Sequence, residues 1–139
     1  MADIKGFERD LNKFAKSIGV KTEIAIKKIA LQTFTGVVKK TPVDTGRARA
    51  GWVIGVEQPR NSPFILGEAK LSASEIGSRA AIEIASLSRI TPFSTVFISN
   101  NLPYIEVLEE GSSKQAPEGM VAVTLTEVER DIKRIENEF

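Results

Sequence analysis

The sequence contains neither cysteine nor histidine among its 139 residues. Without cysteine the chain has no disulfide framework, no thiolate zinc site and no cysteine nucleophile. Without histidine it lacks the commonest metal ligand and the commonest general base near neutral pH. We therefore expect no metal site, no cofactor and no enzymatic activity, so a structural or assembly role leads the function classes.

Aromatic side chains and long apolar runs are also scarce. One tryptophan and one tyrosine are too few for an aromatic platform on which nucleic-acid bases stack. No apolar run approaches the ~18 residues that a membrane-spanning helix needs, and the first residues lack the apolar core of a signal peptide. We expect a soluble protein that stays where it is made and has no membrane partner.

Charge is present in both signs but is unevenly distributed. Residues 1–49 carry eleven Lys and Arg against five Asp and Glu, about +6, whereas residues 50–139 carry eight against thirteen, about −5. Such a division is expected for a nucleic-acid-facing half, for a surface that meets a neighbouring copy, or simply for solvated helix faces. The cations that are candidates to face DNA are Lys13, Lys16, Lys27 and Lys28.

The first forty residues are predicted to be helical, because apolar residues recur at spacings of three and four. Gly19 interrupts this pattern, which favours two helical pieces. Thr41 and Pro42 end the second piece, since a residue before proline avoids the helical region. The first apolar stripe consists of Ile4, Phe7, Leu11, Phe14, Ala15 and Ile18.

The rest of the chain predicts short strands and helices. Residues 51–57 and 94–100 have the β-branched composition of strands. Between them, Ser72 and Glu75 have capping-box spacing at the start of a helix that ends before Thr91 and Pro92.

Two more helices complete the prediction. Residues 103–110 suit a short helix capped by Gly111. Residues 120–126 have a strand-like composition, but apolar residues step by four and three up to Phe139, which favours a helix from about residue 118. The predicted fold is α+β, a single domain over residues 1–139, with long N-terminal helices and a C-terminal helix packed on a small, mainly antiparallel sheet.

Few residues in the sequence suggest a catalytic or metal-binding role. Glu106, Glu109 and Glu110, with Asp44, form the only carboxylate group that could bind a cation or act in acid–base catalysis. Nothing in the sequence fixes a further ligand, so a solvated acidic face is the preferred interpretation.

Two longer motifs are far more specific. Residues 41–52 read TPVDTGRARAGW, and residues 98–111 read ISNNLPYIEVLEEG, followed by QAPEGMV at residues 115–121. Together they resemble the neck and tail-completion proteins of tailed bacteriophages, the group that includes minor tail protein Z-like sequences. The family pattern is TPVDTGxLRxSW followed by NxxPYxxxLExGxSxQAPxGM, and Ala48 and Gly51 depart from it. The resemblance leaves out a variable loop and helix insertion at about residues 57–92.

The resemblance implies a virion structural protein of the neck or tail, assembled in the host cytoplasm and without catalysis. Copies are expected to form a ring, most simply a hexamer, that joins other neck, tail-tube or head-completion proteins. DNA would pass through its lumen without sequence recognition. The alternatives are a tail terminator and, in a different class, a small nucleic-acid-binding protein that uses its basic N-terminal helices.

The motif residues can be given physical roles as hypotheses. Gly46 permits a positive φ in a turn that Asp44 and Thr45 would brace, and Arg47 would reach Glu109, Glu110 or a neighbouring subunit. Tyr104 and Leu108 would pack the short helix down, Asn100 would end a strand, and the loop at residues 112–119 would order on docking. Trp52 suits the core or an interface, and each motif residue could instead only stabilise the monomer. The candidate assembly residues are Asp44, Thr45, Arg47, Arg49, Trp52, Asn100, Tyr104, Glu109, Glu110 and Gln115.

Overall fold

The longest element is a single helix, α1 (Ile4–Lys40). The structure, a computed structural model, describes residues 4–43, 46–63 and 70–136, with side chains described from residue 21 to residue 132 within those ranges. The predicted break at Gly19 is wrong. A glycine inside a helix costs about 1 kcal/mol relative to alanine but removes no hydrogen bond, so the helix continues through it. The predicted end before Pro42 is confirmed.

After α1 the chain turns into a short helix that the sequence did not predict, α2 (Arg47–Ala50). Gly46 starts it with a φ of 84°, in the left-handed region that glycine adopts without steric cost. The expected positive φ is thus confirmed. The turn leaves α2 buried at Ala48 and Ala50.

Two short strands follow, β1 (Val53–Val56) and β2 (Val96–Ser99), and they pair antiparallel with Ile54 opposite Ile98 and Val56 opposite Val96. These four side chains share one face of the ribbon, because side chains alternate along a strand. All four belong to the hydrophobic core or pack against it.

Between the strands lies α3 (Ala73–Ala85), which continues into a short 3-10 helix, η1 (Ser86–Arg89). The predicted capping box is confirmed: the Ser72 hydroxyl accepts a hydrogen bond from the Glu75 N–H at 3.1 Å, and the Glu75 carboxylate accepts from the Ser72 N–H at 3.4 Å. The structure therefore begins this helix where the sequence indicated.

The last two helices are α4 (Ile105–Glu109) and α5 (Val121–Glu136). Gly111 follows α4 with a φ of 93°, as expected for a glycine at a helix end. The helical spacing from residue 121 onward predicted α5 correctly against the strand-like composition. The α+β fold is confirmed.

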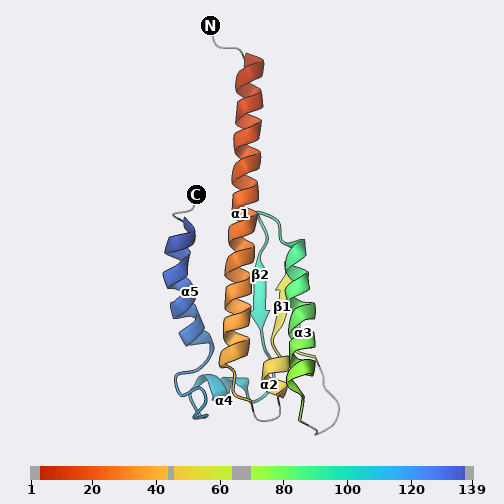
Figure 1. The fold of residues 1–139 in the computed structure, drawn as a ribbon, viewed down its shortest axis with the longest axis vertical. Coiled ribbons are helices and arrows are strands. Elements are labelled where there is room, and N and C mark those ends of the chain that lie inside the picture. The colour runs from red at the N-terminus through yellow and green to blue at the C-terminus, as the bar shows by residue number, and fades with distance from the viewer. Residues whose placement is uncertain (1–3, 44–45, 64–69, 137–139) are drawn as a thin grey trace.

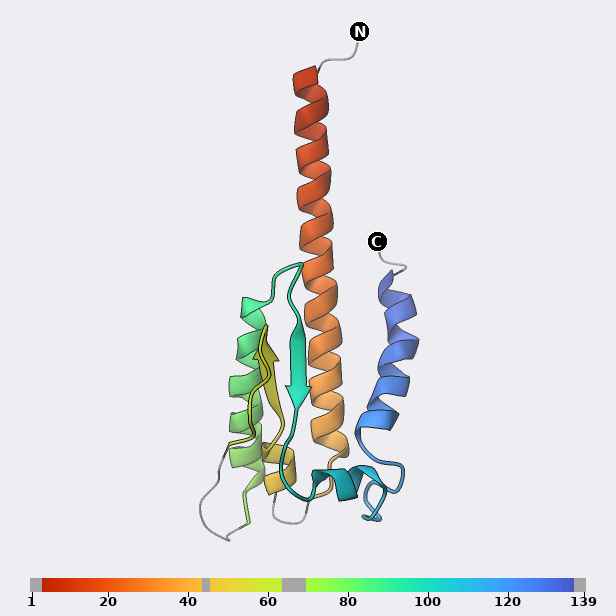
Figure 2. The same cartoon turned by 180° about the vertical axis from the view of Figure 1, so that it is seen from behind.

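The elements lie side by side around the C-terminal half of α1. Figures 1 and 2 show α5 on one flank of α1 and β2 on the other, followed by β1 and α3, with α2 and α4 at the end where α1 finishes. The N-terminal half of α1 extends beyond every other element in both views. The fold therefore consists of a small body and a long projecting helix.

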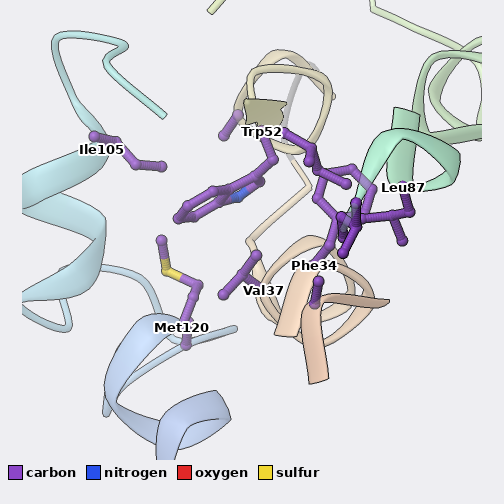
Figure 3. Close-up of a cluster of buried hydrophobic side chains, with 11 residues drawn as sticks. Phe34, Val37, Trp52, Leu87, Ile105 and Met120 are labelled. Atoms are coloured by element: carbon purple, nitrogen blue, oxygen red, sulfur yellow. The ribbon is translucent and has the colours of Figure 1, made fainter. Parts of the chain in front are cut away.

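The core lies at the end of the body where α1, α2 and β1 converge. In Figure 3 the Trp52 ring lies between Ile105 and Met120 on one side and Phe34 and Leu87 on the other. Trp52 is 6% exposed and Met120 is fully buried. The core thus joins α1, β1, η1, α4 and the segment leading into α5.

The helix α5 packs closely along α1. A Cβ on Gly36 would lie 2.7 Å from the Thr124 methyl group, so a larger residue at this position would force the buried Thr124 side chain to shift. Gln32 donates a hydrogen bond to Asp131, and Lys40 pairs with Glu127 at 2.8 Å. Two polar contacts on neighbouring turns of α5 therefore add to the packing of this helix pair.

Candidate functional site

The two recognisable motifs come together at one end of the body. We call residues 41–52 and 98–121 the motif end, which comprises α2, α4 and the turns around them (Figure 1). The two stretches are far apart in the sequence, yet several side chains of one bond the backbone of the other. The motif end is therefore one structural unit.

Thr41 is the centre of this unit and is fully buried. Its hydroxyl donates to the Val37 carbonyl at 2.5 Å and accepts from the Trp52 indole N–H at 2.7 Å. Arg49 adds two hydrogen bonds, from Nε to the Thr41 carbonyl at 2.8 Å and from Nη2 to the Lys39 carbonyl at 2.9 Å. The two Arg49 bonds satisfy carbonyl groups that the end of α1 would otherwise leave unpaired.

The position of Trp52 decides between its two predicted roles. Its ring is in the core and its only polar side-chain atom bonds Thr41, so the core assignment is confirmed. An indole ring that is 6% exposed has almost no surface to offer a neighbouring subunit.

Gln115 and Asn100 join the two motifs directly. The Gln115 side chain accepts from the Val43 N–H at 2.9 Å and donates to the Val43 carbonyl at 3.4 Å. Asn100 donates to the Ala48 carbonyl at 2.8 Å and accepts from the Leu102 N–H at 3.2 Å, which confirms its expected role in a turn after a strand. The loop at residues 112–119 is held against the body by Gln115 and by Ala116, which is buried.

Glu109 has an intramolecular role that the sequence did not suggest. Its carboxylate accepts hydrogen bonds from the N–H groups of Met120, Val121 and Ala122 at 2.8, 2.8 and 3.0 Å. These are donors that the start of α5 would otherwise leave unpaired. Partial burial by itself raises the pKa of Glu109, but the three backbone donors outweigh it and hold the pKa below its ordinary value.

An open cleft of about 660 Å³ lies on the outside of the motif end. Arg47, Tyr104, Leu108, Ser112 and Ser113 are among the residues that line it. Burial raises the pKa of the Tyr104 hydroxyl, and the positive charge of Arg47 partly offsets the shift. The lining of the cleft therefore combines a cation, hydroxyl groups and an apolar wall.

The structure corrects the predicted packing of α4. Tyr104 is 41% exposed, and Ile105 is the α4 residue that is buried. Leu108 packs against the core as expected. Because Tyr104 precedes the first turn of the helix, its ring lies in the cleft instead of beneath α4.

Those of the remaining candidate residues that the structure describes are not brought together into a site. Glu106 and Glu110 are exposed, and no group of three or more acidic residues within the described ranges could hold a metal ion. Lys27 pairs with Glu23 at 2.8 Å, and Lys28 is exposed. Lys13 and Lys16 lie in the projecting half of α1, with side chains outside the described residues, and Asp44 and Thr45 also lie outside them.

The sequence did not predict the ion pair between Arg60 and the buried Glu83. The Arg60 guanidinium binds both carboxylate oxygens of Glu83 at 2.7 and 2.6 Å and donates to the Ile54 carbonyl at 3.1 Å. Glu83 is 6% exposed. Its place among the apolar residues of α3 was the only available signal, and both residues fall within the segment set aside as variable.

Comparisons with protein-family models, with curated proteins and with solved structures find no match to this chain. Within the residues that the structure describes, no helix is both long and apolar enough to cross a lipid bilayer.

Proposed function

We propose that this protein is a virion structural subunit of the bacteriophage neck or tail. In this role, copies assemble into a ring at the head–tail junction or at the head-proximal end of the tail tube. DNA passes through the lumen, and the protein performs no catalysis. A tail terminator, which ends tube growth, is the nearest alternative within the same class.

The observation that carries this proposal is the joining of the two motifs on which the resemblance rests. Gln115 of the second motif bonds both backbone groups of Val43 in the first, and Asn100 bonds Ala48. If the resemblance were a chance similarity of two short stretches, nothing would require them to form one hydrogen-bonded unit. Their residue types are explained by these contacts.

The residues of the motif end fall into two groups, those that form hydrogen bonds inside the body and those that line the open cleft. Thr41, Arg49, Trp52 and Glu109 fix the ends of α1 and α5, which makes the unit rigid. Arg47 and Tyr104 line the open cleft. A rigid platform with a basic cleft supports a role in protein–protein assembly, because a preformed site loses little entropy on binding.

Nucleic-acid binding by the basic helix is the alternative from another class. The N-terminal half of α1 extends beyond the body (Figure 2), and such binding would need a helix that projects in this way. However, the pairing of Lys27 with Glu23 removes one of the four candidate cations from a continuous basic stripe.

The experiment is a measurement of mass in solution over a range of protein concentrations, combined with negative-stain imaging and a duplex-DNA binding assay. The proposal expects closed rings. A protein that stays monomeric at every concentration and with neck or tail-tube partners contradicts it. Salt-sensitive DNA binding by the monomer that is weakened by charge reversal at Lys13 and Lys16 would favour the alternative.

A further inference from the structure

The free edge of β2 faces an open apolar groove. Within the residues that the structure describes, the sheet has only the strands β1 and β2, so β2 is paired on one side. Figures 1 and 2 show α1 on the other side of β2, and a groove of about 350 Å³ lies between the two elements. Ile26, Ile29 and Ala30 of α1 and Val96 and Ile98 of β2 are among its lining residues, none of which is charged.

The hydrogen-bond pattern of the sheet identifies the backbone groups at this edge. In an antiparallel pair, every second residue directs its N–H and C=O toward the partner strand. The Glu57 N–H donates to the Thr95 carbonyl at 2.8 Å, so the backbone groups of Val96 and Ile98 point away from β1. Neither residue has a hydrogen bond on that side in the described part of the chain. Four unpaired backbone groups beside an apolar groove suit an added strand, which main-chain hydrogen bonds hold and whose alternate side chains fill the groove.

The size and chemistry of the groove define the strand that fits. An apolar cavity of about 150 Å³ can hold a benzene ring, so the groove has room for about two large apolar side chains. On a strand that pairs with β2, these side chains would be two residues apart, opposite Val96 and Ile98. A charged side chain would be costly there, because the groove offers it no partner. The added strand should therefore be uncharged, with large apolar residues at two alternate positions.

One segment of the sequence has these properties. Of the stretches of seven or more uncharged residues, four contribute residues to described helices or strands. The fifth is residues 61–67, which read NSPFILG, and residues 64–67 lie outside the described ranges. Phe64 and Leu66 are large, apolar and two residues apart, as the groove requires.

An antiparallel register with Phe64 opposite Ile98 and Leu66 opposite Val96 satisfies the edge. The four unpaired groups of β2 would then exchange hydrogen bonds with Phe64 and Leu66, and both side chains would enter the groove. Pro63 has no N–H to donate, but its position in this register is directed away from β2. The proline is therefore compatible with the added strand.

The same segment is poorly placed to fill the groove of its own chain. Asn101 fixes Ser62, since its N–H donates to the Ser62 hydroxyl at 2.9 Å and its side chain accepts from the Ser62 N–H at 2.7 Å. Leu71 lies beside Gly46, just before α3, which is on the far side of β1 from α1 (Figure 1). A chain that had followed β2 would have to return past both strands in the five residues from Leu66 to Leu71, about 17 Å when fully extended. The groove of another copy imposes no such path.

We propose that residues 63–67 of one copy add to the free edge of β2 in the next copy as a third strand. The segment and the groove are different surfaces, so the contact is head-to-tail, and repeated contacts of this kind close into a ring. The inference rests on the ring proposed above and adds to it the surfaces through which the copies meet. Each copy gives one strand and receives one, so a closed ring leaves no β2 edge unpaired.

Disulfide crosslinking tests the register directly, because the chain contains no cysteine. In the proposed pairing Ile65 lies opposite Phe97 at a non-hydrogen-bonded position, where Cα atoms are about 4.5 Å apart and a disulfide can form. After mild oxidation, Ile65→Cys combined with Phe97→Cys should give a ladder of covalent trimers and larger species on a non-reducing gel. Ile65→Cys combined with Ile82→Cys is the matched control, since Ile82 lies on α3 and is 71% exposed, and it should give no ladder.

Two neighbouring substitutions test whether the segment binds as a strand. At a concentration where the wild type forms rings, Leu66→Asp should give monomers with unchanged far-UV circular dichroism, because it places a charge in the groove. Ile65→Asp should keep the rings, because side chains alternate along a strand and this one points out of the groove. Equal effects of the two substitutions on the mass would overturn the proposal.

Three crosslinking results would also overturn it. Covalent dimers without larger species indicate a two-fold exchange of segments. A disulfide within single chains, without a ladder, indicates that the segment fills its own groove. Absence of any crosslink, while the wild type forms rings by mass, shows that another surface builds the ring and leaves the proposed function standing. A wild type that forms no rings contradicts the proposed function itself.

Discussion

At the scale of single residues, the motif end is organised around buried backbone groups more than around an exposed surface. Arg49 bonds carbonyl groups at the end of α1, the Thr41 hydroxyl accepts from the buried Trp52 N–H, and Glu109 accepts from the first N–H groups of α5. Unpaired buried donors and acceptors cost free energy. Much of the motif that makes the chain recognisable therefore has a stabilising role in the monomer.

Thr41→Val tests the central hydrogen bond of this arrangement. Valine has nearly the same shape but leaves the buried Trp52 N–H without an acceptor, so we expect the free energy of unfolding to fall by about 2 kcal/mol. Urea denaturation monitored by tryptophan fluorescence measures it, with far-UV circular dichroism to verify the native helix content. Thr41→Ser, which keeps the hydroxyl, should lose less. A loss below about 0.5 kcal/mol for the valine variant would mean that the indole finds another partner.

Glu109→Gln tests the cap of α5 and its pH dependence. Loss of the charge at a helix N-terminus should lower the free energy of unfolding at pH 7 by about 1 kcal/mol. Because the folded pKa of Glu109 is lowered, its contribution is fully present above the unfolded pKa of about 4.3 and is lost as the pH falls through the folded value. The difference between variant and wild type should therefore shrink in acid.

The control for this prediction is Glu110→Gln, since Glu110 is the exposed neighbour of Glu109. Its effect should be within about 0.5 kcal/mol at every pH, as for most surface substitutions. Equal effects of the two substitutions, or a Glu109→Gln effect that does not change with pH, would contradict the capping role.

At the scale of elements, the sequence predicted those helix starts, helix ends and helical segments that depend on interactions between residues close together in the chain. The capping box located the start of α3, Pro42 the end of α1, and a sustained three-four spacing identified α5 despite its strand-like first turns. The break at Gly19 failed because one glycine weakens a helix without removing a hydrogen bond.

Other features depend on contacts between distant parts of the chain and had no local signal. The helix α2 is only four residues long and is held by the burial of Ala48 and Ala50. The burial of Ile105 instead of Tyr104 follows from where the core lies relative to α4. The open groove beside β2 likewise appears only once α1 and the sheet are placed together.

The contact between Arg60 and Glu83 ties the segment after β1 to α3, and Arg60→Met tests it. The substitution leaves a carboxylate that is 6% exposed without its cation. Because Arg60 itself is about half exposed, we expect a loss of about 2 kcal/mol, less than for a fully buried pair. Denaturant unfolding measures the change.

Two further variants make this prediction decisive. Arg60→Met combined with Glu83→Leu removes the stranded charge and should recover part of the loss. Arg89→Met, at an exposed arginine of η1, should be close to neutral. An Arg60→Met variant as stable as the Arg89→Met variant would show that solvent or another cation compensates Glu83.

At the scale of the whole molecule, the chain combines a small body with a helix that reaches well beyond it (Figures 1 and 2). Residues 1–49 have a net charge of about +6, and residues 50–139 have a net charge of about −5. A near-neutral total charge that hides two opposite regions favours association between copies, because the basic region of one copy attracts the acidic region of the next. This division of charge is compatible with the assembly proposed above.

The most direct test of this account is the mass of the wild-type protein in solution, measured by light scattering or mass photometry across a concentration series. We predict a closed oligomer of one fixed stoichiometry, with a hexamer as the simplest expectation from the resemblance, that dissociates at high salt as the opposite charges are screened. A single monomeric species at all concentrations and with neck or tail-tube partners would contradict the account.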